Sequence, residues 1–164
     1  MSLDTIDRRI LQLLQVEGRM TNSKLAEEVG ISPSATLERV RKLEREDVIQ
    51  GYHAIVDPES VACGTAAFVS VSLHAHEKRA LEEFEQVVMG FPEVVSCYHV
   101  AGDSDFLLKV TVQNIPAYRR FVLERLSELG NLRHVETAFV LETVKETTAL
   151  PLGDDVVEAE RRNA

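Results

Sequence analysis

The apolar residues of this chain follow two different repeats, and this change of period limits the folds that it can adopt. Near the N-terminus, Ile6, Ile10 and Leu13 recur at steps of three and four residues, which places them on one face of a helix. In residues 67–74, apolar and polar side chains alternate, as in a strand with one buried face. We therefore predict two domains, one built from helices and one of mixed α+β type.

The N-terminal domain carries the start and stop signatures of three helices. Asp4 and Thr21 are suited to cap the first and second helices, and Gly30 ends the second and supplies a tight turn. Ser32 caps the third helix, and Pro33 takes its first position, where the missing N–H costs nothing. Two helices joined by a short turn after a supporting helix predict a helix-turn-helix. The buried side of the third helix is expected to consist of Leu37, Val40 and Leu43.

From residue 66 onward, the predicted order of elements is strand, helix, strand, strand, helix, strand. This βαββαβ order is typical of a ferredoxin-like sheet that carries both helices on one face. The other face also contains apolar residues, which predicts a homodimer formed through it. The elements are expected at residues 67–74, 77–89, 94–101, 105–112, 115–129 and 135–144.

Residues 48–57 connect the two domains and alternate β-branched with polar residues, which predicts one extended strand. The fold class is thus α+β, with an N-terminal three-helix helix-turn-helix domain joined by a strand linker to a βαββαβ ferredoxin-like domain. The boundaries are expected at 1–47 for the helical domain, 48–65 for the linker, 66–150 for the ferredoxin-like domain and 151–164 for a flexible C-terminal tail.

The composition argues against several classes of protein. No apolar run approaches the roughly 18 residues of a membrane helix and no signal-peptide pattern is present, so we expect a cytoplasmic protein without a membrane partner. Cys63 and Cys97 lack metal-ligand spacing and are expected to be reduced thiols. The sequence also predicts no metal site, no catalytic residues and no cofactor motif.

The net charge of −9 is unevenly distributed along the chain. Residues 1–57 carry 8 Lys+Arg and 10 Asp+Glu, a net charge of −2, which leaves −7 on residues 58–164. Screening limits the reach of distant charge to about 8–10 Å, so a local basic stripe can bind phosphates even on an acidic chain.

The outward side of the third helix is the candidate DNA-reading surface. Small and hydroxylated residues at its start can approach base edges, and the arginines further along can read guanine or contact phosphate. Two alternatives are a three-helix protein-interaction domain and a solvated helix face whose arginines pair with neighbouring glutamates. The predicted DNA-binding residues are Thr21, Asn22, Ser32, Ser34, Ala35, Thr36, Glu38, Arg39, Arg41, Lys42 and Arg45.

The order and spacing of short motifs resemble those of the Lrp/AsnC family of feast/famine regulators. The motifs are D-x-x-D-x-x-I-L, G-R, V-G-I-S-P, E-R-V-x-x-L-E, I-x-G-Y and G-D-x-D, within residues 3–150. The resemblance implies a helix-turn-helix at residues 22–41, with residues 32–46 as the reading helix on double-stranded DNA. It further implies a ligand-binding domain with the ferredoxin-like fold, homodimers, and in some members octamers built from four dimers.

The resemblance also implies an amino-acid effector near the Gly-Asp-x-Asp loop and the last strand. Carried over by position, the effector-binding residues are Val100, Ala101, Gly102, Asp103, Asp105, Val135 and Thr137. An aspartate can accept from the effector's ammonium, and backbone N–H groups around the glycine can bind its carboxylate. The same Gly-Asp pair is also compatible with a plain hairpin turn.

The predicted function is a sequence-specific DNA-binding transcriptional regulator that responds to a small effector, an amino acid of the leucine-responsive type. One alternative is an architectural, DNA-compacting protein with weak sequence and ligand selectivity. Another is a haem-pathway decarboxylase, because some proteins similar to this family have that activity; the basic third helix argues against it.

Overall fold

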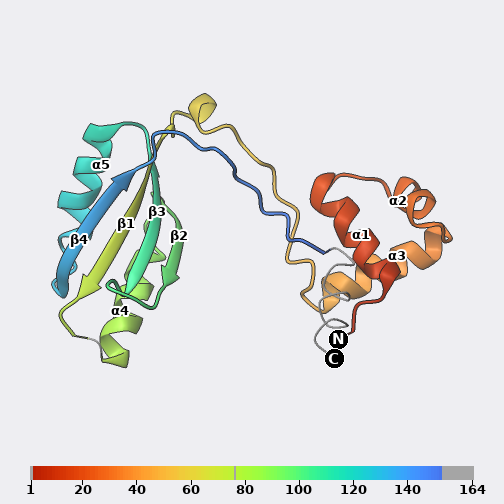
Figure 1. The fold of residues 1–164 in the computed structure, drawn as a ribbon, viewed down its shortest axis with the longest axis horizontal. Coiled ribbons are helices and arrows are strands. Elements are labelled where there is room, and N and C mark those ends of the chain that lie inside the picture. Colours follow the sequence, from red (N-terminus) through yellow and green to blue (C-terminus); the bar gives the residue numbers. More distant parts are fainter. Residues whose placement is uncertain (1, 76, 153–164) are drawn as a thin grey trace, which may run out of the picture. The chain divides into compact units, whose positions relative to one another are not determined.

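The computed structural model describes residues 2–75 and 77–152, which form two compact units. The first unit contains the described residues up to Ala54 and those from Lys145 onward, and the second runs from Ile55 to Val144 (Figure 1). Residues 145–150, which were included in the predicted second domain, therefore group with the first unit. The predicted C-terminal tail, apart from Pro151 and Leu152, lies outside the described residues.

The first unit is built around three helices, and the predicted helix-turn-helix is present. Its central core consists of Ile10, Leu25 and Leu43, which are almost fully buried. Leu37 was expected to be buried but is 38% exposed. The buried stripe of the third helix instead runs through Thr36 and Leu43, one residue out of phase with Leu37. The helices are α1 (Thr5–Val16), α2 (Asn22–Val29) and α3 (Pro33–Arg45).

All three predicted helix caps are present. The Asp4 side chain accepts a hydrogen bond from the Asp7 amide at 2.8 Å. Thr21 and Ser32 cap α2 and α3 in the same way, each at 3.3 Å from a backbone amide. Gly30 has a φ of 72°, a left-handed conformation that glycine adopts without strain. Local sequence signals therefore determine where these helices begin and end.

The predicted linker strand at 48–57 is not a strand in the structure. Its first residues close the end of α3, because the amides of Val48 and Ile49 both donate to the Leu43 carbonyl, at 3.0 and 3.1 Å. Residues 50–57 have no assigned helix or strand, and a short 3₁₀ turn, η1 (Glu59–Val61), follows. Alternating β-branched residues raise strand propensity, but a strand also needs a hydrogen-bonding partner, and this segment pairs with no described part of the chain.

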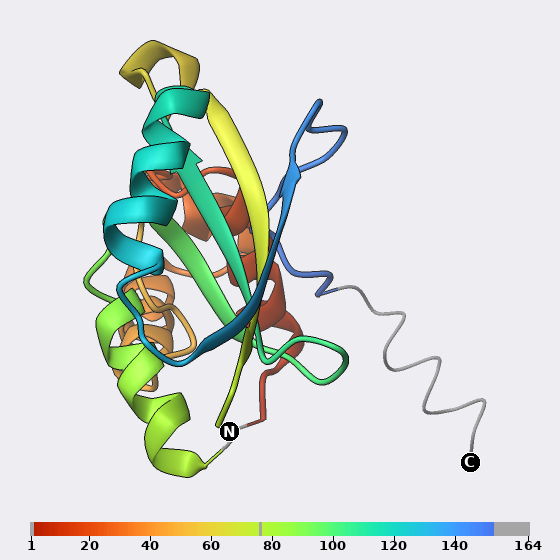
Figure 2. The same cartoon turned by 90° about the vertical axis from the view of Figure 1, so that its left-hand side faces the viewer.

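The second unit is a four-stranded antiparallel sheet with the order β2-β3-β1-β4, and the predicted ferredoxin-like fold is confirmed. Both helices cover one face of the sheet (Figure 2). The elements are β1 (Thr65–Leu73), α4 (Lys78–Val88), β2 (Val94–His99), β3 (Phe106–Val112), α5 (Ile115–Phe121), the π-helical turn η2 (Val122–Leu126) and β4 (Leu132–Phe139).

The core of this unit lies between the sheet and its two helices. Val71 and Leu108, on the two central strands, are fully buried. Phe84 of α4 packs on Phe106 of β3 with 4.5 Å between ring centroids, and Phe121 of α5 is also buried. On the strands, the buried apolar residues occupy alternate positions, as expected for a period of two.

Two predicted elements differ from the structure in extent. The last strand, expected at 135–144, runs from Leu132 to Phe139, the residues that pair with Leu73 to Ala67 of β1. The helix expected at 115–129 is α-helical only to Phe121. It then widens into a π turn, in which the Ser127 amide donates to the Val122 carbonyl at 2.8 Å.

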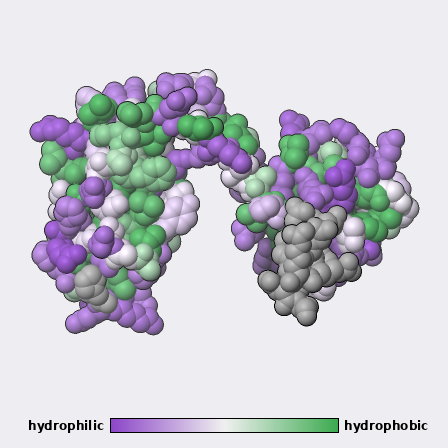
Figure 3. All heavy atoms as spheres, in the orientation of Figure 1, coloured by the Kyte–Doolittle hydropathy of each residue, from purple (hydrophilic) through white to green (hydrophobic). Residues whose placement is uncertain are grey.

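The sheet face opposite the helices carries exposed apolar side chains. Phe68 on β1 is 39% exposed and Tyr98 on β2 is 54% exposed. Figure 3 shows apolar side chains gathered over the strands of this unit, with hydrophilic ones around them. Such a surface favours a partner, in agreement with the expectation for the bare sheet face.

Candidate functional sites

α3 presents a polar and basic face to solvent. The predicted DNA-binding residues that are exposed on it are Ser34, Ala35, Glu38, Arg41, Lys42 and Arg45. Within residues 2–75 and 77–152, none of the three basic side chains in this group forms an ion pair. Their charges are therefore available to phosphates or to the acceptors of guanine.

Two predicted contact residues, Thr21 and Ser32, lie at the N-terminal ends of α2 and α3. Both are exposed, and both hydroxyls are engaged as helix caps. The Ser34 hydroxyl lies 3.1 Å from the Ser32 hydroxyl, so hydroxyl groups cluster where α3 begins. Helix N-termini favour anions because their first amides lack partners within the helix, which makes this end suitable for a phosphate.

Asn22 joins the two helices of the motif. Its side-chain amide donates to the Pro33 carbonyl at 2.7 Å, and its Oδ1 atom is buried without a partner among the described residues. Because this side chain is engaged between α2 and α3, the structure gives Asn22 a positioning role, and its contact with DNA stays a prediction.

Thr36 is a correction to the predicted interface. The side chain is fully buried, and its hydroxyl donates to the Ser32 carbonyl at 3.1 Å. A buried side chain cannot reach a base or a phosphate. A threonine hydroxyl bonded to the carbonyl four residues earlier is compatible with such a buried position.

Arg39 was predicted to contact DNA, but its guanidinium is engaged in ion pairs within the first unit, and its side chain is 32% exposed. Its Nη1 atom lies 2.6 Å from carboxylate oxygens of both Asp4 and Asp7. The Asp7 side chain is only 7% exposed, so this contact neutralises a buried charge. The Asp7 amide and then Arg39 lower the pKa of Asp4, and the bonds to Asp4 and Asp7 raise the pKa of Arg39. Arg39 therefore fastens α3 to the start of α1.

The predicted effector loop joins β2 to β3 and is held against the end of β1. The Val100 amide donates to the Asp105 carbonyl at 2.9 Å, and the Asp105 amide donates to the Val71 carbonyl at 2.9 Å. One carboxylate oxygen of Asp105 accepts from the Leu73 amide at 2.7 Å. The Asp105 side chain therefore positions the loop, a role that the sequence analysis did not assign to it.

The tip of this loop is open to solvent. The exposed residues are Ala101, Gly102 and Asp103. Gly102 has a φ of 147°, a backbone conformation that residues with a side chain rarely adopt. Within the described chain, the amides of Gly102, Asp103 and Ser104 donate no hydrogen bond. The tip thus offers backbone donors beside the exposed carboxylate of Asp103, and these groups complement a zwitterion.

The two predicted effector residues on β4 differ in position. Val135 pairs with Val71 across the sheet, at the end where the loop begins. Thr137 lies further along the strand, and its hydroxyl is hydrogen bonded to the Tyr118 hydroxyl on α5. Burial raises the pKa of Tyr118. The structure therefore brings Val135 to the same end of the sheet as the loop and places Thr137 beneath α5.

The end of β1 also contributes to this site, which the sequence did not predict. The Ser72 hydroxyl donates to the Asp103 carbonyl at 3.2 Å, and the Leu73 amide binds Asp105. Residues 72–73 are some 30 positions from the loop along the chain. Only the strand order, with β1 beside β3, could have indicated this proximity.

Neither a metal-binding cluster nor a membrane-spanning helix is found among the described residues. No group of three or more His, Cys, Asp or Glu side chains could hold a metal ion there. No helix among those residues combines the length and the apolar character needed to cross a bilayer.

A helix-turn-helix with an exposed basic helix and a separate α+β domain define a DNA-binding regulator with a ligand domain. Comparison with known families agrees with this class: residues 3–50 match the winged helix-turn-helix DNA-binding family, and residues 66–150 match the Lrp/AsnC ligand binding domain. The chain belongs to the Lrp/AsnC family of transcription regulators.

Individual relatives are similar over almost the whole chain. The leucine-responsive regulatory protein of Escherichia coli is 40% identical over 148 residues, which is 90% of each chain. A transcriptional regulator from Neisseria meningitidis, solved as an L-Met complex, superposes with a TM-score of 0.87 at 40% identity, over 92% of this chain and 97% of that one. An AsnC family regulator from Agrobacterium tumefaciens gives 0.86 at 38% identity, over 91% and 97%.

Proposed function

We propose that this regulator inserts α3 into the major groove of double-stranded DNA and that a free amino acid, bound at the loop 100–105, changes its affinity for that DNA. The exposed, unpaired basic residues of α3 support the first part. Arg41, Lys42 and Arg45 supply the positive charge, and Ser34 and Ala35 allow close approach to base edges.

The observation that carries the effector proposal is the open tip of the loop. Three backbone amides that have no partner within residues 2–75 and 77–152 lie next to the exposed Asp103 carboxylate in sequence. An α-amino acid carries one carboxylate and one ammonium group, which these donors and this acceptor match. The names of the relatives favour leucine or methionine, since one relative is a leucine-responsive regulator and another was solved with L-Met.

The proposed assembly is a homodimer formed through the bare face of the sheet. Phe68 and Tyr98 on that face are exposed in the single chain, and burying them against a second copy would be favourable. A two-fold symmetric dimer would also present two copies of α3 to paired half-sites on one duplex.

Two measurements test the proposed function. Selection from a random pool of duplexes should enrich one motif, and a salt titration should show that this motif binds at least about 10³-fold tighter than random DNA. A ratio near one would favour the architectural alternative. In the second measurement, leucine or methionine should raise the melting temperature of the wild type by more than that of Asp103→Ala, since a ligand of the folded state stabilises it by mass action. An equal shift in both proteins would reject the loop as the site.

A further inference from the structure

We propose a second ligand site on the sheet unit, a pocket beneath α5 that binds a small zwitterion such as a free α-amino acid. The pocket is a cavity of about 460 Å³ at the end of β3 where Val112 lies. The loop 100–105 lies at the opposite end of that strand. The length of β3 separates the two by roughly 20 Å at 3.3 Å per residue. The pocket therefore shares no residue with the proposed effector site.

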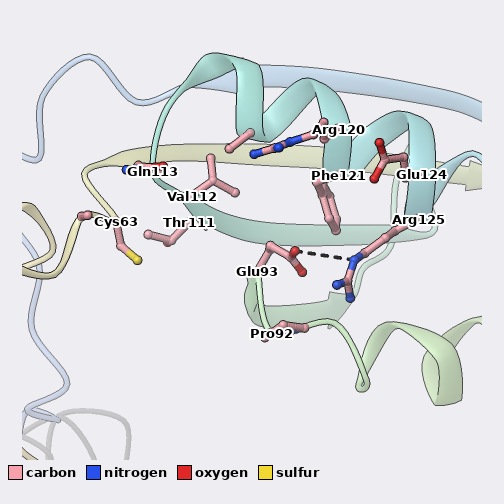
Figure 4. A pocket seen from close by; sticks show the side chains of 12 residues that line it. Cys63, Pro92, Glu93, Thr111, Val112, Gln113, Arg120, Phe121, Glu124 and Arg125 are labelled. Atoms are coloured by element: carbon pink, nitrogen blue, oxygen red, sulfur yellow. Dashed lines mark ion pairs between the residues drawn. The ribbon is translucent and has the colours of Figure 1, made fainter.

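The pocket combines an apolar wall with charged groups at its edges. Figure 4 shows Cys63 at one end and Arg125 at the other, with Val112 and Phe121 between them. Val112 and Phe121 are buried and form the apolar wall. The volume is within the range of about 300–1,000 Å³ that small-molecule sites occupy.

Glu93 provides an acceptor that the protein leaves unsatisfied. One carboxylate oxygen lies 3.6 Å from Nε of Arg125, whereas the Oε2 atom is buried and has no hydrogen-bond partner among the described residues. The side chain as a whole is 25% exposed, and its carboxylate is directed toward the space beneath α5 (Figure 4). An unpaired buried carboxylate oxygen is costly, and an ammonium group from a ligand would satisfy it.

Arg120 provides the complementary positive charge. It is exposed on α5, its side chain extends along the pocket toward Gln113, and it forms no ion pair within the described residues. Arg125, in contrast, is already held between Glu93 and the ring of Phe91, with its Cζ 5.7 Å from the ring centroid. A ligand carboxylate would therefore bind to Arg120, which can form a bidentate contact.

The π-helical turn η2 is an independent reason to assign function to this pocket. It widens the helix after Phe121, and the Ser127 hydroxyl stabilises it by donating to the Val122 carbonyl at 2.8 Å. Both Glu124 and Arg125 line the pocket from this turn. Single π turns inside helices are rare and are frequently found at functional sites.

Among the described residues, one carboxylate oxygen and one guanidinium have no partner, and they lie beside an apolar wall. These three features define the ligand by its chemistry. The ammonium group of an α-amino acid would bind Glu93, its carboxylate would bind Arg120, and an apolar side chain would pack on Val112 and Phe121. A ligand that lacks either charge would leave one of the two groups unpaired.

The two cysteines of the chain allow a test that reports on this pocket alone. Cys63 lines the pocket, and Cys97 lies outside it on β2. The rate of iodoacetamide alkylation at each thiol of the full-length protein would be followed by peptide mass spectrometry, with each of the twenty common L-amino acids as probe. At least one should slow alkylation of Cys63 by about threefold at twice its dissociation constant, and leave Cys97 unchanged. The N-acetyl and amide derivatives of that amino acid should not protect Cys63.

Matched variants separate this site from the loop. Protection of Cys63 should be lost in Glu93→Gln and in Arg120→Ala, and kept in Arg119→Ala, which changes the neighbouring exposed arginine of α5. It should also be kept in Asp103→Ala. The proposal fails if no amino acid protects Cys63, if both pocket variants are protected like the wild type, or if Asp103→Ala abolishes protection. A thermal shift that is lost in Asp103→Ala, without protection of Cys63, would support the loop alone. Protection of Cys63 together with an equal thermal shift in the wild type and in Asp103→Ala would support the pocket alone.

Discussion

At the scale of single residues, Arg39 shows how a side chain can fit a pattern and still serve another purpose. It lies on the same helix as Arg41 and Lys42, and its sequence position predicted a DNA contact. The structure instead places it 2.6 Å from two carboxylates at the start of α1. The sequence could not distinguish these roles, because the choice depends on where α1 lies against α3.

We predict that Arg39→Ala destabilises the helical unit. Removing the guanidinium leaves the buried Asp7 carboxylate without its partner, which should cost about 1–3 kcal/mol of unfolding free energy. Urea unfolding followed by circular dichroism measures this loss. Arg41→Ala is the matched control, since that arginine is exposed and forms no ion pair among the described residues, and it should change stability by less than about 0.5 kcal/mol. Equal stability of the two variants would contradict the structural role of Arg39.

For Lys42 on the exposed side of α3, we expect an effect on DNA binding and none on stability. Lys42→Ala should weaken binding and lower the slope of log K against log salt by about one, because one phosphate contact is lost. Unfolding free energy should be unchanged. Fluorescence anisotropy on one duplex at several salt concentrations measures both affinity and slope. An unaltered slope would mean that α3 does not face the phosphates.

The lowered pKa of Asp4 predicts how the stability of this unit depends on pH. A carboxylate whose pKa is lower in the folded state contributes stability that is fully present above its unfolded value of 3.8. That stability is lost as the pH falls through the folded pKa. The wild type should therefore lose stability below about pH 4 more steeply than Asp4→Asn, which cannot titrate. Urea midpoints between about pH 5 and pH 3 measure the difference, and parallel curves would contradict it.

At the scale of elements, the sequence predicted the features that depend on residues nearby in the chain and missed those that depend on distant residues. The N-termini of α1, α2 and α3 are fixed by Asp4, Thr21 and Ser32, whose side chains accept from amides three residues later. The sequence predicted these N-termini. The extent of β4 depends on pairing with β1, whose residues lie 59 to 72 positions earlier (Leu73 with Leu132, Ala67 with Phe139). The strand predicted at residues 48–57 is absent for the same reason, since the sequence pattern does not show whether a neighbouring strand is present to pair with it.

The effector loop gives a prediction at this scale. Gly102 has a φ of 147°, and no atom lies within 4 Å of where a Cβ would be, so Gly102→Ala acts through backbone strain alone. The strain should cost about 1 kcal/mol and distort the loop tip. Any thermal shift caused by leucine or methionine should shrink, with DNA affinity unchanged. Gly130→Ala is the control, because its surroundings are equally open and its φ is not in the strained region.

At the scale of the whole molecule, the chain passes between the two units twice, before Ile55 and after Val144. The second passage returns residues 145–152 to the helices. Both side-chain amide atoms of Gln15 bond the backbone of Leu150, at 2.6 and 3.2 Å, and Leu152 packs against the helical core. No period in this short, mixed segment predicted the contact. As a consequence, the chain that leaves β4 ends in contact with α1 through hydrogen bonds and apolar packing.

This return segment should therefore contribute to the stability of the DNA-binding unit. Leu152→Ser removes an apolar group from the edge of that core, and Gln15→Ala removes two hydrogen bonds; each should cost about 1 kcal/mol. Hydrogen exchange in α1 should accelerate in both variants, while exchange in β1 and β3 stays unchanged. Leu141→Ser is the control, because Leu141 is 99% exposed and should have no effect on either unit. If α1 exchanges at the wild-type rate in both variants, the segment contributes nothing to the helical unit, and any signal from the ligand domain must reach α1 through the first passage alone.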